Sequence, residues 1–115
     1  MASLTLEEFE KEIYKATSQW KWGEVPVTLK LTPTSIKIRI CISQDIFIDC
    51  FFNEMTGRTS FTLIEKGDRI FGANNTGGWR LHPFENPSDH NPLSQSILFS
   101  DFLNMVGNFL AKPRN

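Results

Sequence analysis

Two imidazole side chains lie close together in the last third of this 115-residue chain, at His82 and His90. The segment between them also holds two carboxylates, Glu85 and Asp89. Imidazole titrates near neutral pH and can act as a general acid or base. Imidazole nitrogen and carboxylate oxygen also suit a divalent metal, although the His-x7-His spacing is not a recognised ligand pattern and the chain has no third histidine. The segment predicts acid/base chemistry or RNA contact at both histidines, with a divalent-metal hydrolase as an alternative; we expect no cofactor and assign no metal ligands.

The same segment also has a purely structural interpretation. His82 can anchor the end of a short strand, while Asp89 and His90 satisfy the backbone groups of a loop that Pro83 and Pro87 stiffen. Glycine, proline and asparagine crowd the stretch 73–93, so most of it is expected to be loop. Long ordered loops are often functional, and both interpretations therefore stay open.

Two arginines accompany the histidines, Arg69 before the loop and Arg80 two residues before His82. Positioned cations stabilise the charge of a phosphoryl group during its transfer. We therefore expect a catalytic set made of His82, His90, Arg80 and Arg69, with RNA as the substrate.

Basic residues also recur along the predicted strands. The strand face opposite the isoleucines is expected to carry Lys30, Lys37, Arg39 and Arg58. A basic sheet face can follow a phosphate backbone, and Trp79 or Phe84 can stack on an unpaired base. Charge on the solvated face of an antiparallel sheet is equally typical of proteins that bind no nucleic acid.

A second hypothesis belongs to a different functional class, a non-catalytic module that binds a protein partner. Interface hot spots favour Trp, Tyr and Arg, and Trp79 directly precedes Arg80. Exposed rings at Trp79 and Phe84 would then form the docking surface.

Helices are predicted at the two ends of the chain. Apolar residues spaced by three and four predict an N-terminal helix from Leu6 to Trp20, and Trp22-Gly23 is expected to end it. Thr5 and Glu8 form the T-x-x-E pattern of a capping box at its start. The same period predicts a second helix over 99–110, followed by Lys112-Pro113.

Between the helices the apolar period changes to two. It predicts strands at 27–31, 36–42, 46–52, 59–65 and 69–72, with one further short strand at 79–82. Their connections are too short for crossover helices, so neighbouring strands must pair antiparallel. We predict a single α+β domain over residues 1–115, in which an antiparallel meander sheet of five to six strands carries both helices on one face.

Composition limits the cellular setting and the partners. The formal net charge is −1, so any basic site must be local. Cys41 and Cys50 lack CxxC spacing, and the sequence shows no signal peptide, which predicts a cytoplasmic protein. No apolar run is long enough to cross a bilayer, so we also predict that the protein is soluble and has no membrane partner. Phe47 and Phe51 on the second face of the third strand lack an obvious cover, which predicts a homodimer through the sheet.

The order of residues from Phe61 to Phe102 resembles the TumE-like toxins of toxin–antitoxin systems. Arg69-Ile70-Phe71-Gly72-Ala73-Asn74-Asn75 is similar to their strand ending in Asp-Asn, and the segment 81–90 is similar to their Pro-His-x-His loop. In this chain Asn74 stands where the family has an acid, and the histidines are further apart. The resemblance implies a cytoplasmic toxin that acts on RNA through His82 and His90 and is neutralised by a small antitoxin protein.

Overall fold

The first helix begins at the predicted capping box. In the computed structural model, which describes residues 4–84, 86, 88–89 and 91–113, helix α1 spans Leu6–Ser18. The Glu8 backbone N–H donates to Thr5 Oγ1 at 3.1 Å, and the Thr5 N–H donates to the Glu8 carboxylate at 2.9 Å. The helix ends before the predicted Trp22-Gly23 because the Gln19 N–H donates to the Ala16 carbonyl at 3.2 Å and the Trp20 N–H to the Thr17 carbonyl at 3.0 Å, which tightens the last turn.

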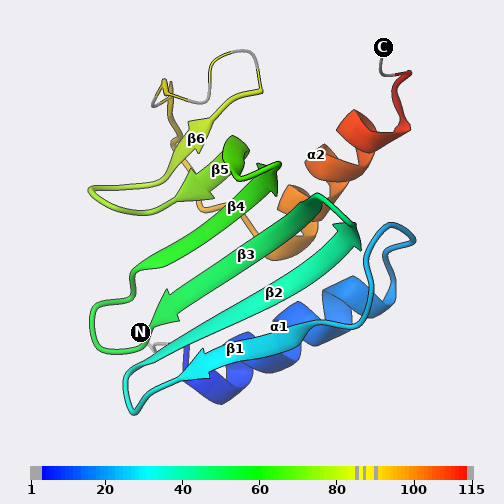
Figure 1. The fold of residues 1–115 in the computed structure, drawn as a ribbon. Helices are drawn as coiled ribbons and strands as arrows, with labels where there is room; N and C mark the ends of the chain where they lie inside the picture. The colour runs from blue at the N-terminus through cyan, green and yellow to red at the C-terminus, as the bar shows by residue number, and fades with distance from the viewer. Residues whose placement is uncertain (1–3, 85, 87, 90, 114–115) are drawn as a thin grey trace.

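Seven antiparallel strands follow one another in chain order across a single sheet (Figure 1). They are β1 (Val27–Leu31), β2 (Ser35–Ser43), β3 (Ile46–Asn53), β4 (Thr59–Glu65), β5 (Asp68–Asn74), β6 (Arg80–His82) and β7 (Asn91–Pro92). The predicted α+β fold with an antiparallel meander is confirmed. The sheet exceeds the predicted five to six strands by the edge strand β7, which is two residues long and too short to show a period of two.

Both helices lie on one face of the sheet, with α1 behind β1 and β2 and with α2 (Phe99–Ala111) further along (Figure 1). We call this the closed face. Its strand residues are apolar and mostly isoleucine or phenylalanine, and Ile38, Ile40 and Ile48 are fully buried there. Phe102 of α2 is also fully buried, between the rings of Phe61 and Phe71 at 5.5 and 5.4 Å. Among the described residues, no helix is long and apolar enough to span a bilayer.

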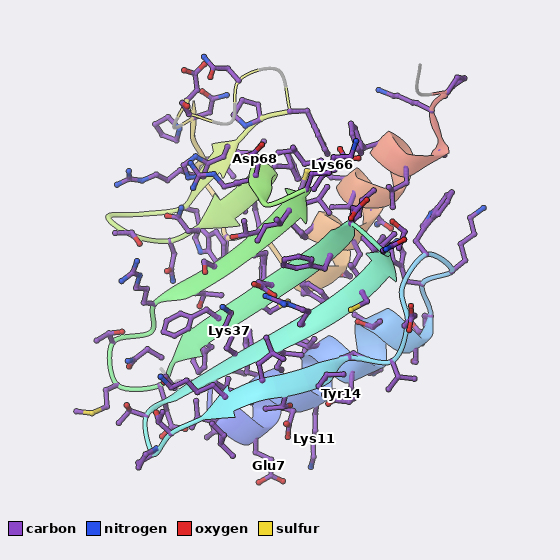
Figure 2. All side chains as sticks on the ribbon, in the orientation of Figure 1. Glu7, Lys11, Tyr14, Lys37, Lys66 and Asp68 are labelled. Atoms are coloured by element: carbon purple, nitrogen blue, oxygen red, sulfur yellow. The ribbon has the colours of Figure 1, made fainter. Side chains whose placement is uncertain are left out.

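The other face of the sheet turns away from the helices, and we call it the open face. Side chains opposite one another in an antiparallel pair point to the same side, so the strand register defines rows that cross the sheet. One row holds Val27, Arg39, Asp49, Thr62, Gly72 and His82; the second holds Lys30, Lys37, Phe51, Ser60, Asn74 and Arg80; the third holds Cys41, Phe47, Ile64 and Arg69. Figure 2 shows Lys37 of the second row on this face. The prediction that Lys30, Lys37 and Arg39 share the face opposite the isoleucines is confirmed.

Candidate functional site

His82 closes β6 on the open face, directly opposite Gly72 of β5. It is only 2% exposed, and its Nε2 lies 3.0 Å from the Asn74 amide nitrogen. The Thr76 backbone N–H donates to Asn74 Oδ1 at 3.1 Å. Since a backbone N–H can only donate, Asn74 turns its oxygen to Thr76 and its NH2 group to His82. His82 Nε2 is therefore the acceptor, and the ring proton of the neutral imidazole is on Nδ1.

This hydrogen bond defines what His82 does in the folded protein. The lone pair of Nε2 is occupied by Asn74, and the ring is buried, so His82 holds the Asn74 amide in one orientation. The predicted His90 lies outside the described residues. The catalytic roles of His82 and His90 stay predictions.

The predicted arginines both lie on the open face, in different rows. Arg69 pairs with Ile64 and lines a pocket together with His82. Arg80 pairs with Asn74, and its Nη2 approaches the loop before β6, where it would lie 2.9 Å from a Cβ on Gly77. The structure therefore places Arg69 and His82 at one pocket and Arg80 beside it.

Gly72 lines that pocket between Arg69 and His82. A Cβ at Gly72 would lie 3.5 Å from Arg69 Cδ and 3.8 Å from His82 Cδ2, so the missing side chain leaves a gap between them. We call the gap the Gly72 pocket; its volume is about 170 Å³. Its lining is Arg58, Ser60, Phe61, Thr62, Arg69, Gly72, Ala73, Asn74, Thr76 and His82.

Sequence reasoning missed the hydroxyl and amide side chains of this pocket. Ser60 and Thr62 alternate with the buried Phe61 and Leu63, so a period of two was enough to place them on the open face. Their proximity to Arg69 depends on the register of β4 against β5, which contains a bulge after Leu63.

A second cluster lies in the middle of the open face, around Asp49. Arg39 donates to both oxygens of Asp49, from Nε at 2.8 Å and from Nη2 at 3.0 Å, and Lys37 Nζ lies 3.6 Å from the same carboxylate. The Arg39 guanidinium also lies over the ring of Phe47, 3.9 Å from its centroid. The hydrogen bonds to Asp49 raise the pKa of Arg39 above its ordinary value. Arg39 is thus a fixed, permanently charged group lying on an aromatic ring.

Charge on the open face differs from that of the whole chain. The three rows hold five cationic side chains and a single carboxylate, Asp49, whereas the chain carries −1. Phe47 and Phe51 stand among these cations and are half-buried. The open face is therefore locally basic and includes aromatic rings.

Trp79 and Phe84 do not form the exposed aromatic surface that the sequence predicts. Both are half-buried. Trp79 directly precedes β6 and packs against the core on the closed face, where its ring is 6.2 Å from that of Phe61. Phe84 stacks between Phe71 and Phe109, at 4.1 Å from each. The expectation of exposed rings was wrong, since core packing covers them; binding of a protein partner at this loop stays a prediction.

The divalent-metal alternative depends on Glu85 and His90, which lie outside the described residues. Within the described part of the chain, no three His, Cys, Asp or Glu side chains lie close enough together to hold a metal ion. The divalent-metal hydrolase therefore stays a prediction from the sequence.

No protein-family model, curated protein or solved structure significantly matches this chain. The resemblance to TumE-like toxins stays a prediction. The function of the protein must therefore be inferred from the geometry of the open face and of the Gly72 pocket.

Proposed function

We propose that the open face binds single-stranded RNA. The observation that carries this proposal is the segregation of charge, five cations and one carboxylate in the three rows of a chain with a net charge of −1. Lysine and arginine that neutralise phosphates supply most of the affinity of a protein for a nucleic-acid backbone. A local basic surface on an otherwise acidic molecule is the footprint expected of such a site.

The shape and chemistry of the face favour a single strand. The second row crosses six strands, which corresponds to about 24 Å at the usual strand spacing. Phe51 in that row can stack on an unpaired base, and the Arg39 guanidinium over Phe47 offers a second planar surface. Hydroxyl and amide groups at Ser60, Thr62 and Asn74 can bond to a ribose 2′-OH, which favours RNA over DNA.

The charge of the face argues against the predicted homodimer through the sheet. A two-fold dimer buries the same patch of both subunits, so it would bring two sets of five cations together. Like charges at an interface are costly unless they are paired. A polyanion is the better complement to this surface.

The toxin interpretation extends the proposal to a cellular effect. RNA binding by a TumE-like toxin in the cytoplasm is expected to arrest growth, and a small antitoxin protein is expected to relieve the arrest. Induced expression of the wild-type chain and of a variant with fewer cations on the open face tests this. Arrest by both proteins alike would separate toxicity from the open face.

The binding proposal is tested by fluorescence anisotropy with a 12-nucleotide single-stranded RNA. We expect the double variant Lys30→Gln/Lys37→Gln to bind about tenfold more weakly and to lower the slope of log affinity against log salt by about 0.7 for each phosphate that is no longer neutralised. The matched control is Lys11→Gln/Lys15→Gln, which removes the same charge from exposed positions of α1 on the other side of the sheet. Equal weakening in both variants, or no binding at low salt, would refute the proposal; equal affinity for single-stranded DNA would refute its RNA preference.

A further inference from the structure

The Gly72 pocket is a hollow in the open face, lined by residues of β4, β5 and β6 and by Arg58 and Thr76 next to these strands. Its volume of about 170 Å³ equals the space of roughly six liquid waters, at ~30 Å³ each. A phosphate group with its attached sugar oxygen fits into such a space. The pocket is therefore suited to one end of a chain molecule and not to a whole nucleotide.

The groups around the pocket are mostly donors. Arg58 and Arg69 supply two guanidinium groups, and Ser60 and Thr62 supply hydroxyls. None of the described residues that line it is Asp or Glu. Asp49, the one carboxylate in the row of Gly72, lies opposite Thr62 and accepts two hydrogen bonds from Arg39. Among the described residues, an anion in the pocket would thus meet cations and dipoles, and the carboxylate of that row is already paired with Arg39.

Asn74 adds a donor whose direction is fixed. Its oxygen accepts from the Thr76 N–H, and one of its two amide hydrogens goes to His82 Nε2. The second amide hydrogen is left to serve a ligand, and the buried His82 prevents the amide from flipping. His82 is therefore a positioning residue: its Nε2 accepts the hydrogen bond from Asn74 and so fixes the direction of the Asn74 amide.

We infer that the Gly72 pocket binds the terminal phosphate of the RNA strand that the open face holds, an inference that rests on the proposed function. A phosphomonoester carries roughly −1.5 to −2 charges near neutral pH, and guanidinium groups such as those that line the pocket bind phosphate oxygens through bidentate, charge-assisted hydrogen bonds. An internal phosphodiester carries a single charge and has a chain on both sides. The pocket therefore distinguishes a phosphorylated end from the middle of a strand.

The test compares three 12-nucleotide RNAs of one sequence, with a 5′-phosphate, a 3′-phosphate or hydroxyls at both ends. The wild-type protein is expected to bind one of the two phosphorylated RNAs about tenfold more tightly than the hydroxyl-ended RNA, as for a hydrogen-bonded charge pair. Arg58→Gln removes one guanidinium from an exposed position, and Gly72→Ala places a methyl group in the pocket, 3.3 Å from the Phe61 carbonyl oxygen. Both are expected to reduce the preference to less than about twofold.

The double variant Lys30→Gln/Lys37→Gln is the matched control, because it should weaken all three RNAs alike and keep the preference. An end preference that survives in Arg58→Gln and Gly72→Ala would overturn the inference, as would its absence in the wild type. Either result leaves RNA binding intact, whereas failure of all three RNAs to bind would refute the proposed function itself. Thermal stabilisation by inorganic phosphate, lost in Arg58→Gln and accompanied by no end preference, would identify a site for free phosphate and overturn the assignment to an RNA end.

Discussion

The two faces of β2 and β3 are built from the same short strands but differ in burial and charge. On the closed face, Ile38 and Ile40 are 0% exposed beneath the helices. On the open face, the residues that alternate with them, Lys37 and Arg39, keep contact with water and share the carboxylate of Asp49. One run of alternating residues thus specifies both the core and a charged surface. Substitutions on the closed face should therefore lower stability, and substitutions on the open face should change RNA binding.

The largest expected effect separates Phe102 on the closed side from Phe51 on the open face. Phe102→Ala should lower the free energy of unfolding by about 3–5 kcal/mol, because it leaves a cavity among fully buried rings. Phe51→Ala should cost about 1 kcal/mol, since its ring is half-buried, but should weaken RNA binding about tenfold. Urea denaturation and RNA anisotropy measure the two quantities. Similar losses of stability in both variants would mean that the two faces do not differ as described.

A smaller effect is expected at Asp49, and its direction is diagnostic. Asp49→Asn removes the one carboxylate of the rows and frees Arg39 and Lys37 for phosphate. We expect RNA to bind about threefold more tightly at low salt, while the free energy of unfolding falls by about 1 kcal/mol or less after allowance for solvent screening. Weaker RNA binding in this variant would contradict this expectation. It would show that Asp49 matters more for holding Arg39 and Lys37 in position than for reducing the positive charge of the open face.

The smallest effect concerns the closed face and high pH. Burial raises the pKa of the Cys50 thiol well above its ordinary value. Cys50 thus keeps its proton in the folded state at pH values where the unfolded chain has begun to lose it. Its contribution to the free energy of unfolding is complete below the pKa of the unfolded thiol, about 8.5, and declines above that pH. Between pH 7 and pH 9, the free energy of unfolding should fall by about 0.8 kcal/mol more in the wild type than in Cys50→Ala. Equal pH dependence of the two proteins in denaturant titrations would contradict this.

Local patterns were sufficient to predict most of the fold. The capping box of Thr5 and Glu8 and the alternation along β2 depend on residues near one another in sequence, and both are present. The end of α1 depends on the bonds of Gln19, and β7 depends on pairing with β6, so neither could be predicted from a local period. The orientation of Phe84 is decided by its stacking on Phe71 and Phe109, which lie far from it in sequence.

The candidate site could be predicted only in part. The basic character of the open face follows from alternation, which places Lys37 and Arg39 opposite the isoleucines. The Gly72 pocket depends on the register that sets His82 opposite Gly72, across a loop that contains Gly77-Gly78. The sequence of such a loop does not predict the register of β5 against β6. Gly77 and Gly78 adopt positive φ values, which are compatible with many turns and therefore with more than one register. The bond between His82 and Asn74, which redefines the role of the histidine, follows from that register.

Cys41 is a natural reporter of the open face, and its alkylation can show whether RNA covers that face. It lies half-buried in the third row opposite Phe47, whereas Cys50 is fully buried and should not react in the folded protein. Saturating single-stranded RNA is expected to slow iodoacetamide labelling of Cys41 several-fold, as read by mass spectrometry of the otherwise unaltered protein. An unchanged labelling rate, with RNA shown to be bound in the same sample, would place the RNA elsewhere on the molecule and contradict binding at the open face.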